Sequence, residues 1–399
     1  MKLLKIKADG LPLFKKSCEI DFFAQQRVTS DQAEKMSCLF SSNTQSFYQN
    51  NVISLIGINA SGKTSILKLL SFVGEMLNNQ SVNSITFKEV LDGLDDNATA
   101  SFDIYFYADI KMVNLLHTII GRKNGRFVII DEYLKSKSST TIKSKTDIFD
   151  FTNCDPLMTR NNDEAFLLDD VSIIVAQNKK TKDQLSMTDM LQYTDINRLS
   201  ISESCPTELI AFFDPSVEYL QIKEHGKDTD IKLKFHEKSE ITLSKMSDLN
   251  RYLSSSTIKG INIFTQAMKT FESGGYLLID ELENHFNHEI ISTLIRLYMD
   301  KKVNPKGAML IFSTHYAELL DEFERNDNIY IVRNKDGISA ENLSVVLKRN
   351  DIKKSDAYQS GFIECTVPMY DAYMSLKKRL IHSLKQQKRC LQECGIGSV

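Results

Sequence analysis

The chain has 399 residues, of which 42% are hydrophobic and 25% charged, and its formal net charge is −3 at pH 7. This composition is that of a folded globular protein and excludes a disordered chain, and the presence of only six prolines excludes a collagen-like or linker-rich chain. The length corresponds to two or three domains of about 150 residues. The balanced charge predicts no general attraction to nucleic acid, so such binding would need a local basic patch.

Targeting signals and cysteines point to the same compartment. No apolar run approaches the roughly 20 residues that span a bilayer, and the N-terminus MKLLKIKADG returns to charge before a signal peptide could form. The seven cysteines are odd in number and scattered, unlike a disulfide framework. We therefore expect a cytoplasmic protein with no membrane partner. Cys390 and Cys394 are either free thiols or, with His382, part of a zinc site.

The N-terminal part, residues 1–135, is predicted to be rich in β-structure. Alternating apolar and polar residues predict strands in LKIKA near the start and in CEIDFF at 18–23. Residues 24–50 are polar and predict a loop. After a strand at 101–108, a hairpin is predicted at 123–125, because Asn-Gly favours tight turns.

The rest of the chain divides into three predicted segments. Between 136 and 205 the composition shifts to Ser, Thr, Lys, Asp and Asn, which we interpret as a polar, partly helical insertion. Residues 206–347 alternate strands and helices, an order typical of a parallel α/β sheet. Residues 348–399 include a basic amphipathic helix. The predicted elements are strands at 52–56, 217–222, 231–235, 241–243, 276–279, 309–312 and 329–332, and helices at 255–271, 287–299 and 368–387.

A phosphate-binding loop is predicted where the strand at 52–56 meets a helical pattern. GINASGKT, from Gly57 to Thr64, fits G-x-x-x-x-G-K-[ST], the Walker A pattern. The backbone N–H groups of such a loop and of the following helix bind phosphate. Lys63 would reach the β- and γ-phosphates of ATP, and the Thr64 hydroxyl would hold Mg²⁺. The residues expected to contact the nucleotide are Gly57, Asn59, Ala60, Ser61, Gly62, Lys63, Thr64 and Ser65.

Two carboxylates follow the apolar run at 276–279. Asp280 and Glu281 would lie at the carboxyl edge of a parallel sheet, where ligands bind in open α/β folds. Asp280 is expected to hold Mg²⁺, and Glu281 to polarise the attacking water. The alternative is an acidic pair that only caps a helix.

Two further candidates flank this strand. His315 follows the strand at 309–312 in the run FSTH and could sense a γ-phosphate, although an isolated histidine in this position is often a surface or capping residue. Ser254, Ser255 and Ser256 stand where a helix begins, so their hydroxyls and free N–H groups predict a second anion site. The alternative is simple helix capping by serine.

As a set, the phosphate loop, LSSST, LLIDELEN and FSTH resemble the ABC-type ATPase heads, closest to the SMC, Rad50 and OLD kind. More narrowly, they resemble the stand-alone ATPases of bacterial anti-phage and abortive-infection systems, such as the AbiL, Septu and PARIS ATPases. The likeness covers roughly 1–130 and 205–347 and includes DELENHFNHE, which is similar to the acidic-Asn-x-x-His stretch of such proteins. It implies a P-loop ABC-type head with a mixed sheet, an N-terminal antiparallel β lobe, a helical insertion and a C-terminal helix.

The resemblance also implies roles. LSSST would be the signature motif, Asp280 the magnesium ligand in Walker B, Glu281 the catalytic carboxylate and His315 the switch histidine. Two ATP molecules would be sandwiched in a head-to-tail dimer or a larger dimer-based oligomer. Serines at 255 and 256, where many relatives have glycine, imply slow or conditional turnover. The segment 136–200 lacks sustained heptads, which excludes long coiled-coil arms, and the position of the glutamine loop stays open, with Gln177 a weak candidate.

The first functional interpretation is an antiviral sensor or regulatory ATPase that controls a separate nuclease- or toxin-like effector encoded nearby, in response to a phage-derived trigger. The second is a DNA-repair or recombination ATPase acting on DNA ends, which would make nucleic acid a partner. A transporter subunit is a weaker third. The basic amphipathic tail could bind a partner, nucleic acid or a membrane, or it could pack on the head with a solvated basic face.

Overall fold

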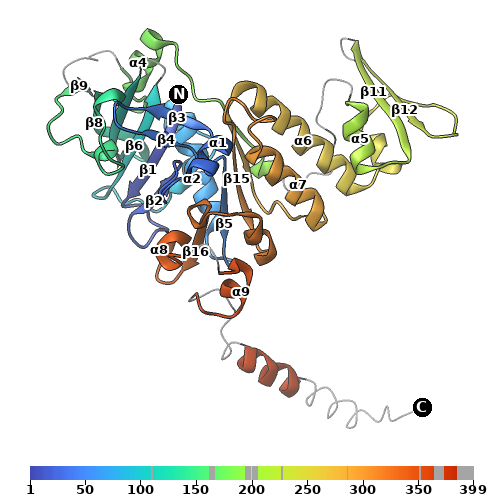
Figure 1. The fold of residues 1–399 in the computed structure, drawn as a ribbon. Coiled ribbons are helices and arrows are strands. Elements are labelled where there is room, and N and C mark those ends of the chain that lie inside the picture. The colour runs from blue at the N-terminus through green and yellow to red at the C-terminus, as the bar shows by residue number, and fades with distance from the viewer. Residues whose placement is uncertain are drawn as a thin grey trace.

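The computed structural model describes residues 1–108, 111–160, 167–193, 199, 205–225, 228–284, 286–349, 352–363 and 373–383. Within these residues the protein is a mixed α/β structure with two six-stranded sheets, one three-stranded sheet and one two-stranded sheet (Figure 1). No helix in this part of the chain is long and apolar enough to cross a bilayer.

The first large sheet is antiparallel throughout, as predicted for the N-terminal lobe. Its strands, in spatial order, are β2 (Cys18–Asp21), β1 (Lys2–Asp9), β6 (Thr99–Ala108), β7 (Met112–Lys123), β8 (Arg126–Ser138) and β9 (Pro156–Thr159). Every second residue of β6 is buried, because alternate side chains of a strand point to one face. The predicted hairpin joins β7 to β8, with Asn124 and Gly125 both at positive φ, as a type I′ turn requires.

The second large sheet is parallel except at one edge. Its strands, in spatial order, are β10 (Met187–Asp189), β14 (Tyr276–Ile279), β15 (Met309–Thr314), β5 (Val52–Ile56), β16 (Ile329–Asn334) and the antiparallel β17 (Ile338–Asn342). All residues of β5, β14 and β15 are buried, which explains why these strands are mostly apolar. The carboxyl ends of these strands therefore meet at one edge.

Helices cover both faces of the parallel sheet. Helix α2 (Lys63–Leu77) packs in one apolar core with residues of both large sheets, and it is buried almost all round. Helices α6 (Ser255–Ser273) and α7 (His288–Met299) share a second core with the same parallel strands. Because only the loop from Gly57 to Gly62 separates α2 from β5, the N-terminus of α2 lies at the carboxyl edge of the sheet.

The segment 24–50 corrects a prediction. It is not a simple loop, because it contains α1 (Ser30–Lys35) and the paired strands β3 (Cys38–Ser41) and β4 (Ser46–Tyr48). A capping box between Thr29 and Gln32 starts the helix. Two aromatic rings, Phe40 and Phe47, are buried and pack with centroids 4.8 Å apart.

Residues 136–205, predicted as an insertion, contribute to both large sheets. Strand β9 pairs with β8, and β10 forms the edge of the parallel sheet beside β14. The helical part is α4 (Ile174–Thr181), which contains Gln177. The described part of this segment is therefore woven into the domain rather than appended to it.

A small lobe stands at the N-terminal end of α6 (Figure 1). It consists of α5 (Thr207–Phe213) and the antiparallel strands β11 (Val217–His225), β12 (Asp228–Phe235) and β13 (Ile241–Leu243). Its own apolar core includes Ile258 and Ile261 of α6, whereas Phe264 and Ala267 of the same helix belong to the core of the parallel sheet. Helix α6 therefore joins the lobe to the body.

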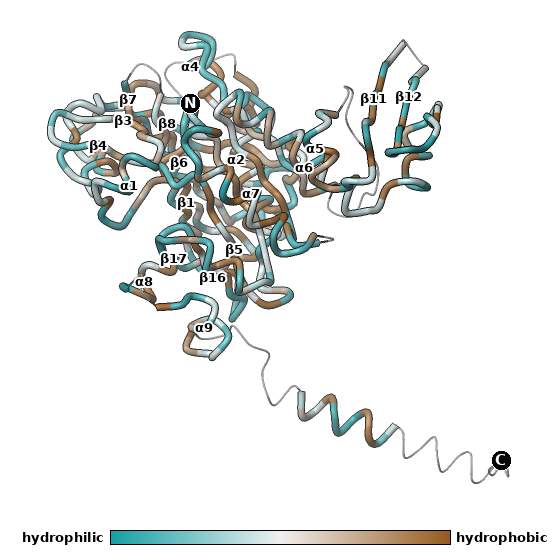
Figure 2. The backbone as a smooth tube through the Cα atoms, turned by 45° about the vertical axis from the view of Figure 1, so that its right-hand side comes forward, coloured by the Kyte–Doolittle hydropathy of each residue, from teal (hydrophilic) through white to brown (hydrophobic). Residues whose placement is uncertain are grey.

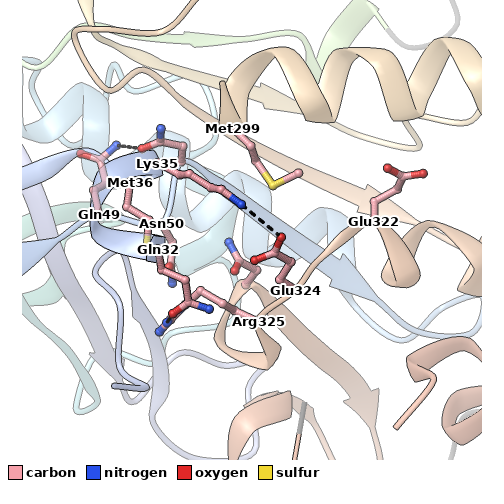
Figure 3. Close-up of a pocket in the computed structure, with 11 residues that line it drawn as sticks. Gln32, Lys35, Met36, Gln49, Asn50, Met299, Glu322, Glu324 and Arg325 are labelled. Carbon is pink, nitrogen blue, oxygen red and sulfur yellow. Dashed lines mark hydrogen bonds and ion pairs between the residues drawn. The ribbon is translucent and has the colours of Figure 1, made fainter. Parts of the chain in front are cut away.

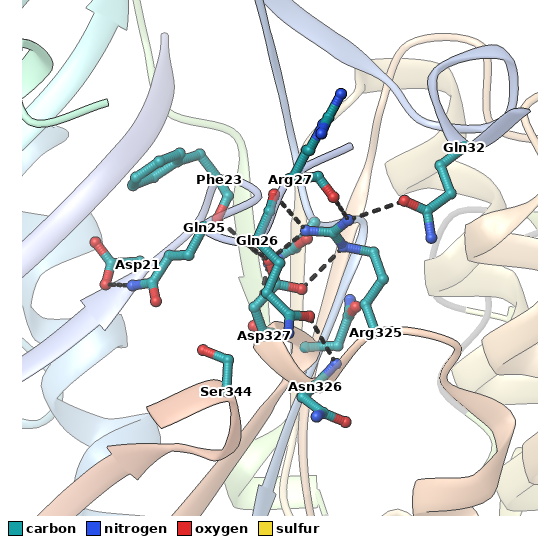
Figure 4. Close-up of polar contacts among 12 residues, drawn as sticks. Asp21, Phe23, Gln25, Gln26, Arg27, Gln32, Arg325, Asn326, Asp327 and Ser344 are labelled. Atoms are coloured by element: carbon teal, nitrogen blue, oxygen red, sulfur yellow. Dashed lines mark hydrogen bonds and ion pairs between the residues drawn. The ribbon is translucent and has the colours of Figure 1, made fainter. Parts of the chain in front are cut away.

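A buried ion pair fastens the N-terminal segment to the parallel sheet (Figure 4). Arg325, which lies shortly before β16, donates Nε to Asp327 Oδ1 at 2.9 Å and Nη2 to the Gln26 carbonyl at 2.9 Å. Asp327 Oδ2 in turn accepts the Gln26 N–H at 2.8 Å. Because each charge is paired and hydrogen-bonded, the cluster is structural.

The C-terminal part contains the short helix α9 (Lys354–Gln359) and, beyond residue 363, is described only as a helix at 373–383, inside the predicted range 368–387. Apolar and polar positions alternate along it (Figure 2), and its apolar residues are exposed. These residues are Tyr373, Leu376, Leu380 and Ile381. The predictions for Cys390 and Cys394 lie outside the described residues.

Candidate functional site

Motifs far apart in the sequence meet at the carboxyl edge of the parallel sheet. The phosphate loop follows β5, Asp280 and Glu281 follow β14, and His315 follows β15. Residue pairing places Ile279 beside Phe312 and Thr314 beside Ile56, so these loops are neighbours. A cavity of about 400 Å³ lies there, lined by the loop from Asn59 to Ser65 and by Glu281 and His315.

The glycines of the loop are required by close packing. A Cβ on Gly62, which has φ +99°, would lie 2.6 Å from Ile338, and a Cβ on Gly57 would lie 2.4 Å from the Val332 carbonyl oxygen. Ala60 also adopts a left-handed conformation, with φ 60°. No side chain caps the N-terminus of α2. The loop therefore leaves backbone N–H groups available to an anion.

Lys63 is folded back onto the loop. Its Nζ donates to the carbonyls of Gly57 at 2.9 Å and Ile58 at 3.2 Å, and it lies 3.4 Å from His315 Nδ1. Burial lowers the pKa of Lys63, and the carboxylates of Asp280, Glu283 and Glu281 oppose that shift. The cation is thus held at the cavity by carbonyl oxygens that a phosphate could replace.

The hydroxyl and carboxylate predicted to hold Mg²⁺ are in direct contact. Thr64 Oγ1 donates to Asp280 Oδ2 at 2.6 Å. Ser313 donates its hydroxyl to Asp280 Oδ1 and accepts the Glu281 N–H at 2.7 Å. Sequence reasoning included Ser313 only in the FSTH run, although a hydroxyl at the end of a fully buried strand is a usable signal. Ser313 thus orients both acidic residues.

Glu281 and His315 face each other across the cavity entrance. His315 Nε2 lies 3.8 Å from Glu281 Oε1, and the Glu281 carboxylate is about half exposed. Glu281 adopts φ 47°, which is unusual for a residue with a side chain and is typical of functional sites. The structure therefore brings Lys63, Thr64, Asp280, Glu281 and His315 to one place.

The other end of the cavity is apolar, and sequence reasoning missed it. Leu13, Asn334 and Ile338 line it, and they come from the loop before β2 and from the β16–β17 hairpin. Leu13 is 53% exposed, and Asn334 Nδ2 donates to the Ala60 carbonyl at 3.2 Å. In the sheet order, β16 and β17 lie on the opposite side of β5 from β14 and β15. The cavity therefore has a polar end and an apolar end.

Within one chain, the three serines do not meet this cavity. Ser254 caps α6 by accepting the Thr257 N–H at 3.0 Å, and its hydroxyl lies 2.8 Å from that of Ser256. The described residues that line the cavity include none of the three. Capping by Ser254 is thus confirmed. These serines could contact a nucleotide only if it were bound in the cavity of another copy of the chain.

A second cavity, of about 160 Å³, lies at the opposite edge of the sheet (Figure 3). It is lined by Gln49, Asn50 and Asn51, which directly precede β5, and by Asn328, which directly precedes β16. Its charges are paired within the protein: Lys35 lies 3.9 Å from Glu324, and Glu322 is 2.9 Å from Arg296. We assign it no part in the chemistry of the first cavity.

No protein-family model matches the chain, and no curated protein matches it. Among the described residues, no group of three or more His, Cys, Asp and Glu side chains is arranged to hold a metal ion. The donor set at the first cavity is instead one hydroxyl and one carboxylate, Thr64 and Asp280. Mg²⁺ is commonly held by one or two such oxygens together with substrate phosphates and water.

Proposed function

We propose that the protein binds and hydrolyses Mg²⁺-ATP at the carboxyl ends of β5, β14 and β15, as an ABC-type ATPase head. The observation that carries the proposal is the 2.6 Å contact between Thr64 and Asp280, on the cavity that Lys63, Glu281 and His315 also line. Thr64 and Asp280 are separated by 216 positions in the chain. A phosphate loop alone would need no such partner.

The residues present fit both the nucleotide and the metal. The uncapped α2 N-terminus and Lys63 suit a polyphosphate, and the oxygens of Thr64 and Asp280 suit a hard cation. When bound, Mg²⁺ would neutralise charge on the β- and γ-phosphates. Leu13 and Ile338 at the apolar end would contact the nucleoside, because the γ-phosphate belongs near Glu281 and His315.

Each side chain then has a defined task. Lys63 exchanges the carbonyls of Gly57 and Ile58 for phosphate oxygens. Glu281 accepts a proton from the attacking water. The hydrogen bond from the Glu281 N–H to Ser313 holds this residue in place. His315 donates to the γ-phosphate from its position between Lys63 and Glu281.

A second copy of the chain would complete the site. The first turn of α6 offers backbone N–H groups and the hydroxyls of Ser255 and Ser256, a suitable cap for a γ-phosphate. Because these serines do not line the cavity of their own chain, we propose a head-to-tail dimer in which each α6 N-terminus closes the partner's nucleotide site.

At the level of biology we propose a cytoplasmic regulatory ATPase of an anti-phage defence system that controls a separate effector protein. This step rests on the resemblance of the motif set to abortive-infection ATPases. A DNA-repair ATPase acting on DNA ends is the alternative. Co-purification with the product of the neighbouring gene, with and without ATP, separates them: a nuclease- or toxin-like partner supports the first.

The biochemical proposal is tested by calorimetric titration with ATP and Mg²⁺. Lys63→Ala should lower affinity by roughly tenfold to a hundredfold, because it removes the cation that faces the phosphates. Lys68→Ala is the matched control, since Lys68 lies on the same helix but pairs with Glu89 at 3.1 Å outside the cavity. Equal affinities for both variants would reject the assignment.

A further inference from the structure

Residues Glu281 to Glu283 form a series of hydrogen bonds to the end of β15. The Glu281 N–H donates to Ser313 Oγ at 2.7 Å, and the Leu282 N–H donates to the Ser313 carbonyl at 3.1 Å. Glu283 continues the series, because its Oε1 accepts the backbone N–H of His315 at 2.5 Å. Backbone and side chain thus join the two catalytic segments.

Glu283 is unusual for a residue in a surface turn. It is only 8% exposed, and its Oε2 is buried without a hydrogen-bond partner among the residues that the structure describes. A buried carboxylate that is not fully hydrogen-bonded is costly and needs a compensating role. Its negative charge also acts on Lys63, where it opposes the effect of burial on the pKa of the lysine.

His315 depends on this contact for its position. It follows directly after the last residue of β15 (Met309–Thr314), so the sheet does not hold its backbone. Its imidazole lies 3.4 Å from Lys63 Nζ and 3.8 Å from Glu281 Oε1. A small rotation of the His315 backbone would move the ring away from both groups.

We propose that Glu283 is a positioning residue that holds His315 in line with the γ-phosphate. This inference rests on the proposed function. Glu283 accepts the His315 N–H through Oε1 at 2.5 Å. It acts through His315 and touches no reacting atom.

The test compares variants that separate the hydrogen bond from the charge. Glu283→Gln keeps a carbonyl oxygen for the His315 N–H and removes the charge. Glu283→Met fills a similar volume and removes both, and Glu283→Ala repeats the test if the methionine variant does not fold. Glu272→Gln, at an exposed position late in α6, is the matched control for the loss of one negative charge.

The first readout is hydrogen exchange of the His315 amide without nucleotide. In Glu283→Met the exchange should be faster by roughly tenfold or more, because the acceptor is gone. In Glu283→Gln and Glu272→Gln it should stay close to that of the unmodified protein. Unchanged exchange in Glu283→Met would overturn the inference, whatever the activity of the protein.

The second readout is steady-state ATP hydrolysis. Glu283→Met should lower kcat by about tenfold or more with KM changed by less than about threefold, and Glu283→Gln should restore most of the rate. Combined with His315→Ala, Glu283→Met should cause no further loss of kcat, because both changes remove the correctly positioned imidazole of His315. Independent, additive losses, or a lower melting temperature with normal kcat, would reduce Glu283 to a structural residue. If the unmodified protein hydrolyses no ATP, the proposed function fails separately from the exchange result.

Discussion

The N-termini of α2 and α6 are the two helix ends predicted to meet an anion, and they differ in what surrounds them. At α2 no side chain caps the helix, Gly62 holds φ 99°, and Lys63, Asp280 and His315 stand around the first turn. At α6 the cap is made internally, because Ser254 Oγ accepts the Thr257 N–H at 3.0 Å. The first end is left open toward a cavity, and at the second the Thr257 N–H is already satisfied in its own chain.

This difference is what the proposed division of one site between two copies needs. The α2 end combines backbone donors, a cation and the oxygens proposed to hold Mg²⁺, so in the proposal it binds the nucleotide without help from the other copy. The α6 end packs in the core of the small lobe and offers hydroxyls and N–H groups. The carboxylate that lines the cavity belongs to the α2 end. In the proposed dimer, the residues around the α2 N-terminus bind the nucleotide, and the α6 N-terminus of the other copy closes the site over it.

The largest effect is expected from Glu281→Gln, which removes the base at the α2 end. Hydrolysis should fall by about a hundredfold or more, since the amide cannot accept a proton from water. ATP binding should persist, because Lys63, Thr64 and Asp280 are unchanged, and the closed dimer should accumulate. Gel filtration with ATP measures this, with Glu289→Gln on α7 as the control. A monomer peak that does not shift, or normal turnover, would contradict it.

At the α6 end, Ser255→Glu should abolish ATP-driven association while each subunit still binds ATP. A carboxylate there would face the partner's γ-phosphate, and like charges in a partly dry site repel by several kcal/mol. If the serines only cap a helix, the change should leave stability nearly unchanged, because Ser254 and not Ser255 makes the cap and an acidic residue suits the first turn of a helix. Sedimentation with and without ATP decides between these, and Ser255→Ala, which keeps the backbone N–H and adds no charge, should still associate.

A smaller effect is expected at the apolar end of the cavity. Leu13→Asp should weaken ATP binding by about tenfold, because it removes apolar contact with the nucleoside and adds a charge. The effect on inorganic triphosphate, which has no nucleoside, should be weaker. Leu157→Asp on β9 is the control, since Leu157 is 55% exposed against 53% for Leu13 and does not line the cavity. Equal losses for both variants would remove Leu13 from the site.

The smallest effect concerns pH. Burial lowers the pKa of Lys63, and a bound polyanion would favour its protonated form, so the pKa is higher in the complex. Affinity should be constant below the pKa of the free site and fall as the pH rises through it, at a pH below the ordinary lysine value of about 10.4. Lys63→Arg stays protonated and should show a flat profile over that range. Identical profiles would show that Lys63 does not titrate in the site.

Much of the α2 end could be predicted from sequence, because its signals are local. The strand Val52–Ile56, the loop and the helix are contiguous in sequence. The apolar run Tyr276–Ile279 predicts a buried strand, and Asp280 and Glu281 follow it directly. Leu13 and Ile338 could not be found in this way, since an apolar residue is usually core and these two reach the cavity from the loop before β2 and from β17. The short helix and strands in 24–50 were not predicted because the segment is mostly polar, and only two of its aromatic residues, Phe40 and Phe47, form the buried pair of the small sheet.

The most direct test of the divided site mixes Lys63→Ala subunits with Ser255→Glu subunits. Each variant alone should be inactive, one for lack of a working phosphate loop and the other for lack of a working cap. The mixed dimer retains one intact site, formed by the phosphate loop of the Ser255→Glu subunit and the α6 N-terminus of the Lys63→Ala subunit. We predict that ATP hydrolysis and ATP-driven association both return in the mixture. A mixture as inactive as its components, or a Ser255→Glu protein that associates and hydrolyses ATP at the normal rate, would contradict a site divided between two copies.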